Sequence, residues 1–157
     1  MPSKGVSGNR KLGAKNALLP LAILLSLSGN LAYGQTGSGY DPNKEAIYVQ
    51  VILTEAAGES EEGQVAVGEV LRNRHWSLRG FSGIRRPDLQ RFLERQDAKT
   101  IAGAKRSLLR ARGGSYIAGG ATHFENVEAF GMPWWAKKMR VTAKIGRHTF
   151  FKEVLND

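Results

Sequence analysis

Apolar residues recur every three or four positions over the first part of the chain after residue 40. Ile47, Tyr48, Val51 and Ile52 follow this spacing, which places them on one face of an amphipathic helix. The pair Asp41-Pro42 suits the start of such a helix, with an aspartate cap before a proline in the first helical position. Gly58 suits its end, so the pattern predicts a helix from about residue 41 to 57.

Cap residues, apolar spacing and terminating glycines predict three further helices. Ser60 is a good cap for a helix through Val67 and Leu71 to about residue 75, and Gly68 inside it indicates close packing against another helix. The range 77–86 is basic and irregular, and 87–96 predicts a short helix. Asp97 caps a last helix that ends at the glycine pair 113–114.

The periodicity changes near the C-terminus. The range 121–126 alternates weakly, as a short strand does, and Val141, Ala143 and Ile145 alternate with polar residues. Gly146 offers a turn, and 148–152 forms the returning strand of a hairpin. The sequence therefore predicts an α+β fold with a helical N-terminal part and a small antiparallel sheet near the C-terminus.

The first 34 residues have the pattern of a secretory signal. A basic stretch without acids precedes an apolar run over 17–27, which is shorter than the roughly 20 residues of a membrane-spanning helix. Small residues, Ala32 and Gly34, stand at the −3 and −1 positions of a cut after residue 34. We predict a signal peptide over 1–34, a flexible linker over 35–40 and a catalytic domain over 41–157. An uncleaved membrane anchor is the alternative, and both interpretations place the domain outside the inner membrane.

Charge and cysteine content narrow the possible partners and cofactors. The 157 residues hold 23 Lys and Arg against 14 Asp and Glu, a net charge of +9. Residues 1–34 contribute four of the basic residues and no acid, so residues 35–157 keep a net charge of +5. An exported cationic protein meets cell-wall polymers and lipid headgroups, which argues against nucleic acid as a partner. Without cysteine, and with three scattered histidines, the sequence predicts no metal site and no cofactor.

Glu55 is the most informative single residue. It shares the helix face of Val51 and Ile52 and stands in the last turn, where the helix dipole is negative. Both surroundings disfavour a charged carboxylate and raise its pKa. A carboxyl group that stays protonated near neutral pH suits protonation of a leaving glycosidic oxygen. The alternative is a boundary glutamate on an ordinary amphipathic helix.

Several short sequence motifs lie around Glu55, and a second set of motifs follows near the C-terminus. Residues 54–59 read Thr-Glu-Ala-Ala-Gly-Glu, 62–68 read Glu-Gly-Gln-Val-Ala-Val-Gly and 71–74 read Leu-Arg-Asn-Arg. Later, 120–124 read Gly-Ala-Thr-His-Phe, 135–136 read Trp-Ala and 145–151 read Ile-Gly-Arg-His-Thr-Phe-Phe. Together these blocks resemble the SleB-type cell-wall hydrolases, the spore cortex-lytic family and its relatives. The resemblance extends over about 45–152.

This resemblance implies a lysozyme-like, lytic-transglycosylase-like fold with a sugar-binding cleft. It also implies cleavage of the MurNAc–GlcNAc bond in peptidoglycan glycan strands, with Glu55 as the essential acid. The range 85–96 departs from the Gln-Phe-Ser-type stretch usual in the family. We therefore expect the part of the cleft built from this range to differ.

Whether a second carboxylate lies in the cleft would decide between hydrolysis and lytic transglycosylation. Hydrolysis usually needs two, and Glu59, Glu125 and Glu128 are the candidates, although the last two are most simply surface charges. If none reaches the cleft, Glu55 must act as acid and then as base. The C6 hydroxyl of the substrate then attacks and leaves a 1,6-anhydro sugar, which is lytic transglycosylation. We favour this reaction.

Four residues are candidates for substrate binding: Glu59, Gln64, Trp134 and, as the family resemblance implies, His123. The alternative for His123 is an ordinary polar residue on a strand. Glu59 also suits ordering of the turn after Gly58, and Gln64 could cap a loop instead. Of the two adjacent tryptophans, we expect Trp135 to pack and Trp134 to be more exposed, because neighbouring rings seldom share an environment.

Two other functions compete with this one. A non-catalytic, cationic wall-binding module would need only the charge and the tryptophans, but it has no use for a poorly solvated Glu55. An N-acetylmuramoyl-L-alanine amidase would commonly need zinc ligands, and the sequence lacks a convincing set. We expect no separate wall-targeting domain in a chain this short, so a delivery or activating protein is a further possibility.

Overall fold

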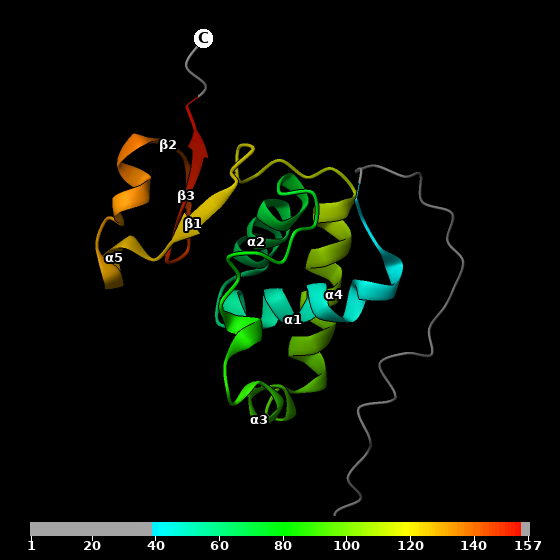
Figure 1. Cartoon of the computed structure of the whole chain (residues 1–157). Helices are drawn as coiled ribbons and strands as arrows, with labels where there is room; N and C mark the ends of the chain where they lie inside the picture. Colours follow the sequence, from blue (N-terminus) through cyan, green and yellow to red (C-terminus); the bar gives the residue numbers. More distant parts are fainter. Residues whose placement is uncertain (1–38, 155–157) are drawn as a thin grey trace, which may run out of the picture. The chain divides into compact units, whose positions relative to one another are not determined.

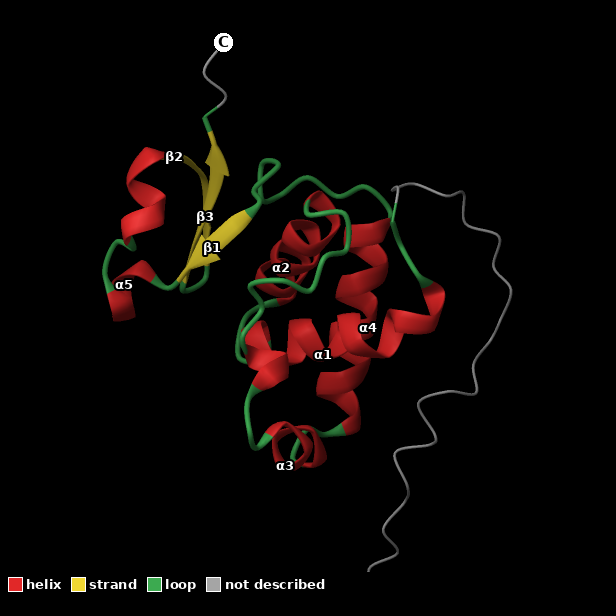
Figure 2. Cartoon of the chain, in the orientation of Figure 1, coloured by secondary structure: helices red, strands yellow, loops and turns green. Residues whose placement is uncertain are grey.

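The structure, a computed structural model, describes residues 39–154. Its main helices are α1 (Glu45–Ala56), α2 (Glu61–Asn73), α3 (Leu89–Glu94), α4 (Ala98–Arg112) and α5 (Val127–Phe130). Its strands are β1 (His123–Glu125), β2 (Met139–Ile145) and β3 (His148–Glu153) (Figures 1 and 2). This confirms the predicted α+β class with the sheet near the C-terminus. Within residues 39–154, no helix is both long and apolar enough to cross a membrane.

Two of the three long helices, α2 and α4, begin at caps that the sequence predicts, whereas α1 begins at Glu45 after Lys44, which makes no side-chain cap. The Asp41 side chain accepts a hydrogen bond from the Asn43 amide at 2.9 Å and opens a 3-10 turn, Pro42–Lys44, that leads into α1. Ser60 caps α2 by accepting from the Gly63 amide, and Asp97 caps α4 by accepting from the Thr100 amide. Each cap satisfies a backbone amide that has no partner inside its helix.

The core lies where α1, α2 and α4 pack together. Val51 and Ile52 of α1 are fully buried, as the helical spacing predicts. Gly68 lets α2 approach α4 closely, because a Cβ at this position would lie 2.8 Å from the Cβ of Ala111. Burial of each large aliphatic side chain contributes roughly 1.5–3 kcal/mol, so this cluster supplies much of the stability that holds Glu55 in place.

The sheet has the order β1-β3-β2, and both strand pairs are antiparallel. Phe124 pairs with Phe150, and the register between β2 and β3 shifts between Val141 and Ala143. Gly146, with a φ of +57°, makes the predicted turn between β2 and β3. The predicted strand and hairpin are therefore confirmed, with an irregularity in β2 that alternation alone could not predict.

Side-chain hydrogen bonds and rings join the helices to the sheet. Asn73 of α2 donates to the Ala121 carbonyl at 2.8 Å, just before β1. The rings of Phe81 and Phe124 lie 6.3 Å apart, and Phe124 is 5.8 Å from Phe150. These contacts fix β1 beside the loop that follows α2, which is the arrangement that builds the site.

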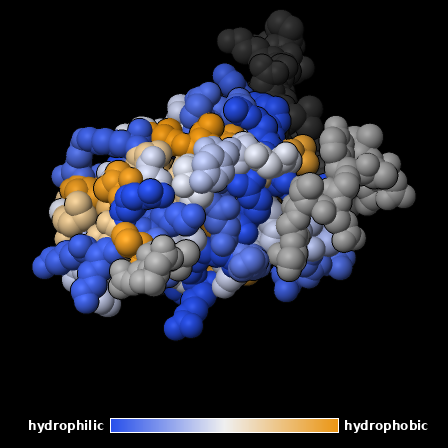
Figure 3. Space-filling model, turned by 90° about the horizontal axis from the view of Figure 1, so that it is seen from above, coloured by the Kyte–Doolittle hydropathy of each residue, from blue (hydrophilic) through white to orange (hydrophobic). Residues whose placement is uncertain are grey.

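Two short elements between β1 and β2 were not predicted. They are α5 and a 3-10 helix, Trp134–Lys138. Both are short and carry mostly exposed residues, so they have no apolar periodicity to detect. The surface seen in Figure 3 is mostly hydrophilic, with small hydrophobic patches. The large apolar side chains that are exposed include Phe130, Trp134 and Val141.

The predicted signal segment 1–34 and most of the linker lie outside the described residues. Tyr40, which we assigned to the linker, packs against the folded domain. Its ring lies 5.5 Å from that of Tyr48 and 4.8 Å from that of Trp76, and its hydroxyl donates to Glu45 at 2.7 Å. Burial and the neighbouring Glu45 raise the pKa of Tyr40 to about 12. The packed part therefore includes Tyr40.

Candidate active site

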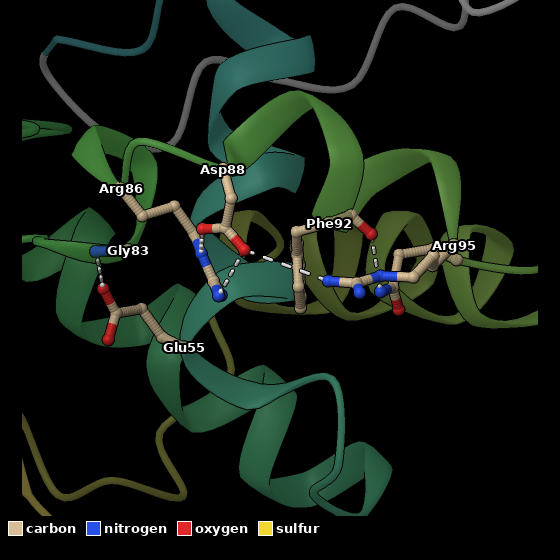
Figure 4. A network of polar contacts seen from close by, with 7 residues as sticks. Glu55, Gly83, Arg86, Asp88, Phe92 and Arg95 are labelled. Atoms are coloured by element: carbon tan, nitrogen blue, oxygen red, sulfur yellow. Dashed lines mark hydrogen bonds and ion pairs between the residues drawn. The ribbon is translucent and has the colours of Figure 1, made fainter.

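Glu55 stands in the last turn of α1, with its carboxyl group partly buried. One oxygen, Oε1, accepts a hydrogen bond from the backbone amide of Gly83 at 3.0 Å (Figure 4). Gly83 belongs to the loop after α2, so the acid is held between α1 and that loop. Among residues 39–154 no other hydrogen bond reaches this carboxyl group, which leaves its second oxygen available to a ligand.

The surroundings of Glu55 favour its protonated form. Burial is the main cause and raises the pKa of Glu55; the Gly83 amide lowers it, and the negative charge of Glu125 raises it again. The net result is a pKa above the ordinary value for glutamate. The sequence predicted this direction from burial, whereas the contribution of Glu125 could not be read from it.

The Gly83 contact requires a glycine. A Cβ at this position would lie 2.5 Å from both Cβ and Oγ1 of Thr54, the residue before the acid. Contacts this short do not occur between real carbon atoms, so any side chain would push the loop away from α1. The short turn Gly83–Arg85 can therefore reach Glu55 only because residue 83 lacks a side chain.

Gly83→Ala is expected to lower the stability of the domain by about 1–3 kcal/mol through overpacking. It should also weaken the hydrogen bond to Glu55, and loss of that bond raises the pKa of this carboxyl group. The alkaline limb of the pH–activity profile should then move to higher pH. Gly103→Ala on α4 is the control, because its Cβ would meet nothing closer than 3.8 Å. Unchanged melting and pH profiles for Gly83→Ala would contradict this account.

A small network holds the rest of this loop. Arg86 donates to both oxygens of Asp88, at 2.6 and 3.2 Å, and its guanidinium lies 4.6 Å from the ring centre of Phe92 on α3 (Figure 4). Arg95 approaches Asp88 at 3.9 Å. The range 85–96 departs from the family pattern. These side-chain contacts hold it in place directly after Gly83, whose amide binds Glu55.

Glu55 opens into a cleft of about 530 Å³. Its walls come from the end of α1 and α2, the loop after α2, β1 and the segment after it. The lining residues are Glu55, Arg74, Gly80, Phe81, Ser82, His123, Phe124, Glu125, Phe130 and Trp135. The mixture of aromatic rings with a few charged groups suits a sugar chain, because flat apolar faces of sugars pack on rings while hydroxyls bind polar groups.

Glu125 lies in this cleft together with Glu55. The sequence left open whether it is a second carboxylate or a surface charge, and favoured the surface. Its Oε1 accepts from the Asn126 amide at 2.8 Å, which orients the side chain at the end of β1. Glu128, the other candidate after β1, is exposed and pairs with Lys144 at 2.6 Å, and it does not line the cleft.

His123 and Trp135 form a second wall of the cleft. Their rings lie 5.3 Å apart, and Trp135 also meets Phe151 edge-on at 5.5 Å. Burial and the charge of Arg74 lower the pKa of His123, against a smaller opposing effect of Glu153. His123 thus lines the cleft and stays a candidate for substrate binding, while Trp135 both packs and lines the cleft, a combination that was not predicted from the sequence.

Glu59, a predicted substrate-binding residue, does not line the cleft. Its side chain is only 4% exposed and binds Arg147 in the β2–β3 turn, accepting from the side chain at 2.7 Å and the backbone at 3.2 Å. Burial raises the pKa of Glu59, but these bonds outweigh it and the pKa is lowered. Glu59 therefore anchors the hairpin, the kind of ordering role that the sequence left open.

Gln64 and Trp134 also lie away from the cleft lining. Gln64 is 8% exposed and accepts a hydrogen bond from Ser107 of α4 at 3.3 Å, so it links two helices in the interior. Trp134 is 81% exposed, as expected, but it is Trp135 beside it that faces the cleft. Of the four predicted substrate-binding residues, His123 alone joins Glu55 there.

The described residues offer no evident metal site. Within residues 39–154, no three side chains among His, Cys, Asp and Glu gather closely enough to hold an ion.

Comparison with known proteins identifies the fold. The sequence matches no family model and no curated protein. Among solved structures, the catalytic domain of the Bacillus cereus SleB protein matches with 27% identity and a TM-score of 0.55, over 76% of this chain and 98% of that one. The chain has the fold of a SleB catalytic domain. The SleB catalytic domain of Bacillus anthracis, described as a germination-specific lytic transglycosylase, matches with 25% identity and a TM-score of 0.56, over 74% and 100% of the two chains.

The SleB match confirms the resemblance that the sequence blocks indicated, and with it the predicted fold class. Both SleB structures are catalytic domains, which confirms the prediction of an enzyme over a silent wall-binding module. The identities of 25–27% are low, so the roles of individual residues rest on the geometry of this chain.

Proposed function

We propose that the chain is an exported enzyme that cleaves the MurNAc–GlcNAc bond of peptidoglycan as a lytic transglycosylase. The observation that carries the proposal is Glu55, a partly buried carboxyl group with a raised pKa at the wall of an aromatic cleft. The SleB fold and the lytic activity named for the Bacillus anthracis domain support it. Export is supported by the signal pattern over residues 1–34 and by the external location of the substrate.

In this mechanism Glu55 acts twice. The protonated carboxyl group first donates its proton to the bridging oxygen as the bond from that oxygen to C1 of MurNAc breaks. The resulting carboxylate then accepts the proton of the C6 hydroxyl of the same sugar. The C6 oxygen forms a bond to C1, which gives a 1,6-anhydro end and returns Glu55 to its protonated state. Water is not consumed.

The position of Glu125 favours hydrolysis as a second candidate function. Inverting glycosidases use one carboxylic acid and one carboxylate that activates water across the sugar ring. Among the described residues that line this cleft, Glu55 and Glu125 are the two with carboxyl groups, so Glu125 could fill the second role. In the lytic mechanism its charge serves instead to keep Glu55 protonated.

The products distinguish these reactions. Purified sacculi digested with the wild-type enzyme should release anhydro-muropeptides, which mass spectrometry recognises by the missing water. Reducing-end muropeptides of normal mass would indicate hydrolysis and move the base role to Glu125. Free stem peptides with intact glycan strands would indicate an amidase and contradict the proposal.

Glu125→Gln gives a further test through pH. Because the charge of Glu125 raises the pKa of Glu55, its removal should lower that pKa. The acid form of Glu55 is then lost at lower pH, so activity should fall earlier as pH rises and stay near the wild-type value on the acidic side. Glu128→Gln, an exposed acid paired with Lys144, should leave the profile unchanged. Loss of activity at every pH would mean that Glu125 is the catalytic base.

A further inference from the structure

A second hollow adjoins the cleft beyond Trp135. It has a volume of about 780 Å³ and shares His123 and Trp135 with the cleft that contains Glu55. Its other walls include Lys137 and Lys138 at the end of the 3-10 helix, and Glu153 near the end of β3. A ligand in the cleft could therefore continue into this hollow past the two shared rings.

The side chains of the two lysines and of Glu153 in this hollow form no ion pair with another residue of the described part of the chain. Neither the Lys137 nor the Lys138 side chain forms an ion pair or hydrogen bond within residues 39–154, and both residues are exposed. The carboxylate of Glu153 likewise has no ion pair there. Met139, which pairs with Glu153 across β2 and β3, and Trp135 supply apolar surface between these charges. Two cations, one anion and an apolar floor thus stand side by side.

We propose that this hollow binds the stem peptide carried by the MurNAc sugar, with Lys137 and Lys138 binding the peptide carboxylates. The inference rests on the proposed function, because the peptide must branch from a glycan strand that occupies the Glu55 cleft. A stem peptide has the matching chemistry: carboxylates for the lysines, small alanine methyl groups for Trp135 and Met139, and the free amine of its diamino acid for Glu153.

The acid in the hollow favours a peptide over a simple polyanion. A phosphate-bearing wall polymer would be attracted to Lys137 and Lys138 but repelled by Glu153, and it has no methyl groups for the apolar floor. A peptide with charges of both signs satisfies all of these groups. The enzyme should therefore prefer strands that still carry their peptides.

The test uses soluble glycan strands of matched length, either with peptides intact or after enzymatic removal of the peptides. The wild-type enzyme should show a lower KM for the peptide-bearing strands. The double variant Lys137→Gln/Lys138→Gln should raise KM for these strands by about three- to tenfold, the effect of two exposed charge pairs, with kcat nearly unchanged. On peptide-free strands its KM should match that of the wild type.

A matched control removes two charges elsewhere. Lys99→Gln/Arg106→Gln changes two exposed cations of α4 that line neither hollow, and it should leave both KM values at the wild-type level. Glu153→Gln should raise KM only for peptides that keep their free amine. Equal effects of Lys137→Gln/Lys138→Gln on both substrates, or no effect, would overturn the inference while the proposed function stands. A wild-type enzyme that cuts neither strand would overturn the proposed function itself.

Discussion

Glu55→Gln is expected to slow the solubilisation of purified sacculi by about 10²–10⁴-fold, the usual contribution of a catalytic acid or base. Glutamine has nearly the shape of glutamate and can still accept the hydrogen bond from the Gly83 amide. It cannot donate a proton to the glycosidic oxygen or take one from the C6 hydroxyl. The loss should therefore appear in kcat, as measured by the fall in turbidity of a sacculus suspension.

The fold should survive this change. Burial disfavours the charged form of Glu55, so Glu55→Gln removes an unfavourable charge and its melting temperature should equal or exceed the wild-type value. Glu62→Gln, an exposed position on α2, is the control for loss of one acid and should retain full activity. Wild-type rates for Glu55→Gln in a folded protein would assign the acid role to another residue.

Glu69→Ala is expected to give the largest loss of stability, about 2–5 kcal/mol. Glu69 of α2 is 0% exposed, and its two oxygens accept from the backbone amides of Ile117 and Ala118 at 2.9 and 2.8 Å. Alanine would leave both amides without these acceptors and open a cavity beside them. Thermal unfolding should show a melting temperature lower by roughly 10 °C.

The Glu69→Ala change should also disturb the cleft and lower activity. Residues 117 and 118 lead into β1, which carries His123 and Glu125, so release of this segment should lower activity even below the new melting temperature. Glu62→Ala, an exposed acid on the same helix, should change the melting temperature by no more than about 2 °C, as expected for a surface position. A Glu69→Ala protein as stable as the wild type would contradict the anchoring role.

The long elements were predictable because strong local signals coincide with packing. The caps Asp41, Ser60 and Asp97 and the apolar spacing of Val51 and Ile52 each act within one or two helical turns. The raised pKa of Glu55 also follows from its position on a buried face near a helix end. These features depend on residues that are close together in the sequence. They can therefore be predicted from the sequence alone.

The rest of the site depends on contacts across the chain. Glu59 sits four residues after Glu55, yet Arg147 draws it to the hairpin, 88 positions away. Glu125 looks like a surface charge in the sequence, and only the folded structure shows that it lines the same cleft as Glu55. Gly83 reads as an ordinary loop glycine, and only its 3.0 Å bond to Glu55 shows why it is needed. Trp135 could have been found from the family blocks, which contain it, had its burial not been taken to exclude a place in the cleft.

The most direct test of the central claim is a crystal structure of the Glu55→Gln variant with a peptidoglycan tetrasaccharide bound. We expect the sugar chain to lie in the cleft between Phe81 and Trp135, with one MurNAc–GlcNAc oxygen about 3 Å from the side chain at position 55. A sugar chain bound elsewhere, or bound in the cleft with every glycosidic oxygen beyond reach of position 55, would contradict the assignment of Glu55 as the catalytic acid.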